Sequence, residues 1–154
     1  MTERADDRAR ITDVLARYSL AVDSKHIDRL STCFTADAVA GYWPGHDLRG
    51  RAAIADFIAG AIEGFRSTQH LIGTHTFDFD GDAASTSTYV HAAHVVPGAA
   101  GERVVVVGGC YTDRFVVDEG DWRIAERRFE ALWTTDAAST SMMPTAGRVS
   151  GAAR

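Results

Sequence analysis

The stretch "STQHLIGTHTFDFDGDAASTSTYVHAAHV", residues 67–95, decides the fold class of this chain. Residues 67–80 and 83–96 are rich in β-branched and aromatic side chains, and the "DGD" between them is typical of a tight turn. These features predict two antiparallel strands. The stretch also contains four histidines, so the faces of these strands bear directly on the chemistry of the chain.

Downstream of the hairpin the strand pattern continues. Residues 103–117, "RVVVVGGCYTDRFVV", form a long β-branched run, and "DEGD" is a second turn sequence. Residues 122–133, "WRIAERRFEALW", alternate well enough to be the antiparallel partner of that run. The C-terminal half is therefore expected to be a four-strand meander.

Upstream, the hydrophobic period is that of helices. Ile11, Val14, Leu15, Tyr18 and Val22 form one apolar stripe, which predicts an amphipathic helix over residues 6–22. A short helix is expected at residues 27–34, and the "TADA" sequence after it ends this helix. A short strand follows at residues 38–45, and a third helix at residues 51–65. Helices followed by a meander predict an α+β fold, in which helices cover one face of a curved sheet.

The length and composition bound the classes of protein to consider. With 154 residues, the chain is long enough for one packed domain, which we place at residues 1–133. Residues 134–154 are small and polar, so we expect a C-terminal tail that is loose or packed on a neighbouring subunit.

The charge pattern argues against several partners. The net charge is −5 and the arginines are scattered among acids, so nucleic acid is not expected as a partner. No long apolar run and no leader-like start occur, which predicts a cytoplasmic protein without a membrane partner. Cys33 and Cys110 lack metal-knuckle or disulfide spacing and are expected to be reduced.

The alternation of a strand assigns each histidine to a face. On the first strand His70 shares its face with Ile72, whereas His75 belongs to the opposite face. On the return strand His91 and His94 lie on opposite faces. Alternation thus allows His70 and His91 to line one cavity, although a half-exposed packing role is the commoner use of a strand histidine. Two histidines at HxxH spacing on a strand point to opposite faces and cannot both bind one metal ion, so no metal site is expected.

A catalytic histidine needs an orienting carboxylate, and the first helix offers one. Asp23 follows the apolar stripe, but it also fits a simple helix-capping role. Tyr18 lies on the stripe, where a plain core aromatic is the alternative. The two positions are about 140° apart on an ideal helix, so both reach one cavity only if the helix ends near Asp23. No nucleotide-binding or nucleophile-elbow motif occurs, and no cofactor is expected.

The chain contains, in this order, the segments "ITDVLARYSLAVDSKHIDRLSTCFTADA", "LRGRAAIADFI", "TQHLIGTHTFDFDGDAASTSTYV" and "GGCYTDRFVVDEGDWRIAERRF". Together these four segments resemble the SnoaL-like branch of the nuclear-transport-factor-2-like superfamily. The resemblance spans residues 8–133. It implies a cystatin-like α+β barrel, in which a curved mixed or antiparallel sheet forms a cone around the N-terminal helices, with a deep apolar pocket. It also implies a homo-oligomer, dimer or trimer.

The resemblance further implies a cofactor-independent lyase of dehydratase or dehydrohalogenase type that acts on a small hydrophobic, ring-containing substrate. The same fold also serves ketosteroid-isomerase-like and polyketide-cyclase-like isomerases and non-catalytic binding modules, so these alternatives stay open. The residues expected to be catalytic are Asp23, His70, Tyr18 and His91. The residues expected to bind substrate are Val22, Trp43, Ile72, Tyr89, Cys110 and Arg128, the last with a solvated surface arginine as its alternative.

Overall fold

The computed structural model describes residues 2–136 and contains two α-helices, a 3₁₀ helix and six strands. In chain order these are α1 (Thr2–Asp23), η1 (Ile27–Thr32), β1 (Phe34–Trp43), β2 (His46–Arg49), α2 (Arg51–Glu63), β3 (Ser67–Asp80), β4 (Ala83–Val96), β5 (Arg103–Asp118) and β6 (Asp121–Thr134).

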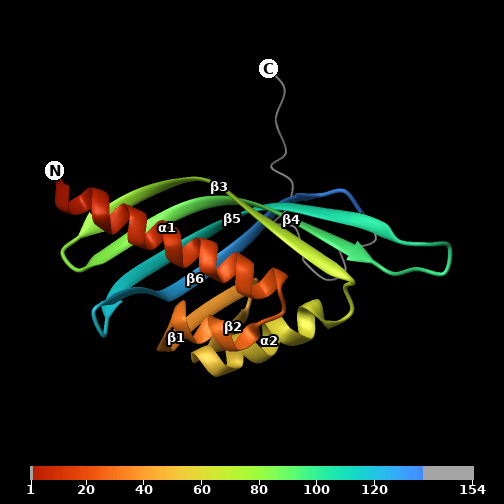
Figure 1. Cartoon of the computed structure of the whole chain (residues 1–154), viewed down its shortest axis with the longest axis horizontal. Coiled ribbons are helices and arrows are strands. Elements are labelled where there is room, and N and C mark those ends of the chain that lie inside the picture. Colours follow the sequence, from red (N-terminus) through yellow and green to blue (C-terminus); the bar gives the residue numbers. More distant parts are fainter. Residues whose placement is uncertain (1, 137–154) are drawn as a thin grey trace, which may run out of the picture.

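The six strands form one open, mixed sheet. Their order is β2-β1-β6-β5-β4-β3; β3 to β6 make the predicted antiparallel meander, and β1 runs parallel to β6. Helix α1 crosses one face of the meander, and α2 lies beside β1 and β2 (Figure 1). The predicted α+β class, with helices against one face of a sheet, is confirmed, and the sheet is not closed into a barrel.

The N-terminal half differs from the prediction in three details. The expected short helix over residues 27–34 is a single 3₁₀ segment, and the "TADA" that was expected to close it belongs to β1. Strand β2 was not predicted. It is four residues long and too short to show a period of its own, and its pairing with β1 is what makes it a strand.

A β-bulge in β3 changes which side chains face the helices. The pairing with β4 shifts between Ile72 and His75, where Gly73 lies so close to Tyr89 that a Cβ atom would be 3.2 Å from the Tyr89 carbonyl oxygen. A bulge inserts one extra residue and reverses the alternation beyond it. His75 therefore lies on the same face as His70, and the prediction that it faces the opposite side was wrong.

The core lies between α1, α2 and the covered face of the sheet, which we call the inner face. The predicted stripe of α1 is buried, from Ile11 to Val22, and α2 buries every fourth residue, Ile54, Ile58 and Ile62. From the sheet, Phe34, Phe115 and Ile124 are fully buried against these helices. Apolar burial on this scale is the main favourable term in folding.

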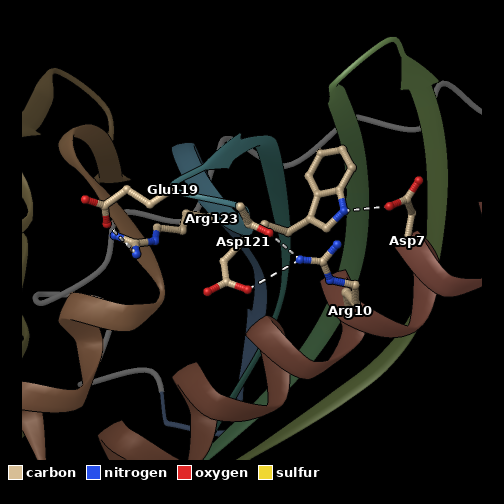
Figure 2. A network of polar contacts seen from close by, with 7 residues as sticks. Asp7, Arg10, Glu119, Asp121 and Arg123 are labelled. Carbon is tan, nitrogen blue, oxygen red and sulfur yellow. Dashed lines mark hydrogen bonds and ion pairs between the residues drawn. The ribbon is translucent and has the colours of Figure 1, made fainter.

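Polar contacts fix the N-terminal half of α1 to the turn between β5 and β6 (Figure 2). The Arg10 guanidinium donates to the Gly120 carbonyl oxygen at 2.6 Å, and the Trp122 indole N–H donates to the Asp7 carboxylate at 2.8 Å. The helix is thus held in one orientation across the sheet, which determines where its C-terminal end, Asp23, meets β3.

Two further sequence-based predictions concern membrane-spanning segments and the C-terminal tail. Within residues 2–136, no helix combines the length and apolar character needed to span a membrane. Strand β6 ends at Thr134, and residues 137–154, most of the predicted C-terminal tail, lie outside the described residues. The division into a domain and a tail stays a prediction.

Candidate active site

Asp23 lies where α1 ends. The backbone N–H of Ser24 donates to the Leu20 carbonyl oxygen, and Lys25 then adopts a left-handed conformation with φ of 58°. A left-handed residue just past the last turn is a common helix stop. Because the helix ends here, the Asp23 carboxylate turns to β3 while Tyr18 stays in the core, so the two need not share one helical face.

The Asp23 carboxylate accepts two hydrogen bonds from His70 and one from Thr68. Its oxygens lie 2.7 Å from His70 Nδ1, 2.8 Å from the His70 backbone nitrogen and 2.9 Å from the Thr68 hydroxyl. An ionised carboxylate only accepts hydrogen bonds, so Nδ1 carries a proton and donates it. In the neutral ring Nε2 is then left with a free lone pair, which is the state a general base requires.

The charge state of Asp23 supports this arrangement. Partial burial acts to raise its pKa, but the hydrogen bonds from the His70 side chain and backbone, with that from Thr68, outweigh burial and lower the pKa below its ordinary value. Asp23 is therefore ionised at neutral pH. The side chains of Asp23 and His70 retain 19% and 8% exposure, which places the pair at the edge of the interior rather than deep within it.

The second histidine beside His70 is His94, not His91. His94 is buried on the inner face of β4, with its ring centroid 6.0 Å from that of His70 and 4.6 Å from that of Phe65. His91 pairs with Leu71 and packs against Trp133 on the opposite, outer face. The expected pairing of His70 with His91 was wrong, because His70 lies opposite Ala92 and alternation from there includes His94.

We expect His94 to make stability depend on pH. Burial, and to a smaller degree the neighbouring His70, lowers its pKa below 6.5. Between the folded and unfolded pKa values only the unfolded chain gains this proton, so the free energy of unfolding falls as the pH drops below about 6.5. Urea unfolding at pH 7.5 and 5.5 should show a smaller loss for His94→Gln than for the wild type. His26→Gln, at an exposed histidine, is the control and should match the wild type.

A second polar cluster lies deeper in the interior. Arg127 on β6 is fully buried, and its Nε and Nη2 atoms each donate to the Asp113 carboxylate at 2.7 Å. The guanidinium carbon lies 4.2 Å and 4.0 Å from the ring centroids of Tyr18 and Tyr111, and the Tyr18 hydroxyl is 3.2 Å from that of Tyr42. We call these five residues the Arg127 cluster.

The Arg127 cluster has one donor without a protein acceptor. Burial acts to lower the pKa of Arg127, but the Asp113 carboxylate raises it well above the ordinary value, so the guanidinium is always charged. Burial raises the pKa values of Tyr42 and Tyr111, which stay neutral hydroxyl groups. Among the described residues, none accepts a hydrogen bond from Arg127 Nη1. A buried N–H group of this kind is available to an oxygen or halide of a ligand.

Comparison with known proteins identifies the family. The model of the SnoaL-like domain matches residues 3–128, which is most of the chain. The chain belongs to the SnoaL-like family. The resemblance inferred from the sequence is thereby confirmed.

Relatives of this SnoaL-like chain include the uncharacterized protein Rv2910c of Mycobacterium tuberculosis, 31% identical over 79% of this chain and 82% of the relative. A putative scytalone dehydratase from Novosphingobium aromaticivorans is 26% identical, with a TM-score of 0.81 over 88% of this chain and 91% of that chain. The hexachlorocyclohexane dehydrochlorinase LinA-type3 from Novosphingobium barchaimii is 17% identical, with a TM-score of 0.77 over 87% and 92%, and shows the shared fold.

The expected substrate-binding residues of this SnoaL-like domain are divided between the two faces. Val22 and Ile72 lie on the inner side, and Trp43 packs against the edge of the core. Tyr89 and Cys110 pair with each other on the outer face, away from His70. Arg128 is half-exposed and bonds Asp47 at 2.6 Å, which is the surface alternative already considered for it.

Two hollows of the surface lie away from the Asp23–His70 pair and from the Arg127 cluster. One of about 460 Å³ runs along α1 beside Arg17, Leu20 and Trp122, and one of about 210 Å³ lies over the bulge of β3 beside Tyr89 and Cys110. Neither is lined by His70 or Arg127. Among the described residues, no group of three or more His, Cys, Asp or Glu side chains is placed to hold a metal ion.

Proposed function

We propose that this SnoaL-like protein is a cofactor-independent lyase that removes water or a halide from a small, hydrophobic, ring-containing substrate. One observation carries the proposal, the 2.7 Å contact between His70 Nδ1 and the Asp23 carboxylate, which leaves Nε2 as a base. The solved structure of a putative scytalone dehydratase, which is 26% identical, adds support.

In the proposed reaction, His70 Nε2 takes a proton from a ring carbon next to the one that bears the leaving group. The electron pair of that C–H bond forms a C=C bond, and the bond to the hydroxyl or halide breaks. Arg127 Nη1 and the Tyr18 hydroxyl would donate hydrogen bonds to the departing atom, and a leaving hydroxide would take its proton from Tyr18 or from the protonated His70; the buried Nη1 without a protein acceptor supports this role. General-base catalysis supplies about 10²–10⁴-fold, and positioning adds more.

The strand register gives the separation along β4 between the Asp23–His70 pair and the Arg127 cluster. His70 pairs with Ala92 and Tyr111 with Thr88, so four residues of β4 separate them, roughly 14 Å along the strand. A substrate would have to fit between the His70 and Arg127 side chains, which extend from these two positions. Ile72 and Val90 pair with each other between these two positions on the inner face, and together with Val22 they would supply the apolar contacts that a ring requires.

An isomerase of the ketosteroid-isomerase or polyketide-cyclase type would use the same base, and a mass measurement separates it from a lyase. The protein is incubated in D₂O with cyclic β-hydroxy ketones, chlorinated cyclohexanes and cyclic β,γ-unsaturated ketones, the last as substrates for an isomerase, and the products are analysed by mass spectrometry. A lyase gives products that have lost water or hydrogen chloride, whereas an isomerase gives products of unchanged composition with deuterium incorporated. Binding without either change would assign a non-catalytic module.

The remaining expectations for partners and location stay predictions. We expect a homo-oligomer and a cytoplasmic protein, and neither nucleic acid nor a membrane as a partner.

A further inference from the structure

Two buried threonines on β4 carry hydroxyl groups that nothing in the fold explains. Thr86 and Thr88 are 2% and 0% exposed, on the inner face of the sheet, which α1 crosses (Figure 1). Among the described residues, none is hydrogen-bonded to either hydroxyl group. A buried hydroxyl without a partner destabilises the folded state, because its hydrogen bonds to water are lost. Valine has nearly the same shape and avoids this cost, so the two hydroxyl groups point to a role other than packing.

Other buried hydroxyl groups of the protein do have partners. The Thr68 hydroxyl donates to a carboxylate at 2.9 Å, and the Ser19 hydroxyl donates to a main-chain carbonyl oxygen at 3.2 Å. Thr35, which also has a buried hydroxyl without a partner in the described part of the chain, lies on β1, three strands away from β4. On β4, by contrast, two such hydroxyl groups lie on the same face and only two residues apart. Their arrangement is therefore a local feature of the inner face of this strand.

The strand register places both threonines beside the Arg127 cluster. Thr86 lies directly opposite Asp113, and Thr88 lies directly opposite Tyr111. Side chains in such pairs have Cβ atoms about 4.5–5.5 Å apart. The Asp113 carboxylate accepts hydrogen bonds from Arg127, and the guanidinium carbon lies 4.0 Å from the Tyr111 ring centroid. The two hydroxyl groups thus border the cluster that contains the buried Arg127 Nη1, which also lacks an acceptor among the described residues.

The charges of this region favour an uncharged ligand group. The Arg127 guanidinium and the Asp113 carboxylate neutralise each other, and both are fully buried. A carboxylate or phosphate bound beside the threonines would lie near the Asp113 carboxylate, and the cost of removing it from water would not be offset. A hydroxyl group or a carbonyl oxygen needs only hydrogen bonds. A threonine hydroxyl suits both, because it can donate one hydrogen bond and accept others.

We propose that Thr86 and Thr88 form a subsite for a second, uncharged oxygen of the substrate, which we call the threonine subsite. This inference rests on the proposed function, in which His70 takes a proton at the other end of the substrate. Ala92, the partner of His70, and Thr88 are four residues apart on β4. A contact of about 3 Å at each end of this span leaves roughly 8 Å for the carbon skeleton. The second oxygen is therefore remote from the carbon that loses its proton, and the threonine subsite determines specificity rather than the chemical step.

Isothermal titration calorimetry of the full chain with matched two-ring ketones tests the proposal. The probe 1-decalone has one oxygen, and 6-hydroxy-1-decalone has a second oxygen at the far end of the same skeleton. We expect the wild type to bind the hydroxy ketone about tenfold more tightly, the effect of one net hydrogen bond. Thr86→Val combined with Thr88→Val should bind the two probes equally, whereas the corresponding double serine variant should keep the preference. The 1,6-dione should bind like the hydroxy ketone, and the 6-carboxylate should bind more weakly than 1-decalone.

Two controls make the result specific. Thr112→Val makes the same change at an exposed position on β5, and it should keep the wild-type preference. The double valine variant should unfold at a urea concentration no lower than the wild type, because it loses no hydrogen bond within the protein. A lower midpoint would show that the hydroxyl groups have protein partners, and it would overturn the proposal. Equal binding of both probes by the wild type, or no binding of either, would assign the hydroxyl groups to buried water and overturn it as well.

His70→Gln separates this inference from the proposed function. The variant should lose turnover but keep the preference for 6-hydroxy-1-decalone, since the threonines lie away from the base. If the wild type eliminates neither water nor halide, but its preference depends on Thr86 and Thr88, the proposed function fails and the subsite belongs to a binding module. If the wild type catalyses elimination and the double valine variant keeps the preference, the subsite alone is wrong.

Discussion

Replacing His70 by glutamine is expected to lower turnover by about 10²- to 10⁴-fold, the usual contribution of a general base. Glutamine keeps a donor for the Asp23 carboxylate, which lies 2.7 Å from Nδ1 of the histidine, but it offers no basic nitrogen. Ligand affinity should change little, because binding depends on the apolar interior. The turnover number measured with the substrate that the mass-spectrometric screen identifies, together with a binding constant for the product, separates these two effects.

Two matched variants make this result specific. His91→Gln removes an imidazole from the outer face of β4, and His75→Gln removes one from the inner face of β3 beside Thr12. Neither contacts Asp23, and both should retain wild-type turnover. If His70→Gln keeps full turnover, or if His91→Gln reduces turnover as strongly, the Asp23–His70 pair is not the base and only the SnoaL-like fold remains.

The sequence was sufficient for the fold class because the two kinds of period are well separated along the chain. The apolar stripe of α1 and the alternation in β3 to β6 each depend on local spacing. The helix and the four strands could therefore be predicted from the residues alone. Strand β2 is four residues long and pairs with β1, and β1 in turn pairs with the distant β6, Gly41 beside Arg128 for example. Contacts of that kind leave little trace in a window of ten residues.

The candidate site was only partly predictable for the same reason. Asp23 and His70 were named from the family resemblance, and the structure places them in contact. The face of His75 was wrong because a bulge at Gly73 is invisible to simple alternation, and His91 was chosen over His94 because the pairing register of the strands was unknown. The Arg127 cluster was missed, although Asp113 lies between inward-facing Tyr111 and Phe115 in the sequence. A carboxylate at such a position was a usable signal of a buried cation.

The largest stability effect is expected for Asp113→Ala, which leaves the fully buried Arg127 guanidinium without its carboxylate. Removing one partner of a buried ion pair costs about 3–5 kcal/mol, because the remaining charge stays in a medium that solvates it poorly. The free energy of unfolding, measured by urea titration with circular dichroism, should fall by this amount. Asp47→Ala is the control, since Asp47 bonds the half-exposed Arg128 in a similar geometry and should cost at most about 1 kcal/mol.

A double variant then separates stability from function at this pair. Asp113→Leu combined with Arg127→Met removes both charges and fills the space, so it should recover most of the stability that Asp113→Ala loses. If Arg127 Nη1 donates to the leaving group, the stable double variant should still show turnover reduced by about 10²-fold, the effect of losing one positioned donor. A double variant that is both stable and fully active would make the pair purely structural, and the proposed role of Arg127 in catalysis would be wrong. Equal costs for Asp113→Ala and Asp47→Ala would contradict the burial argument itself.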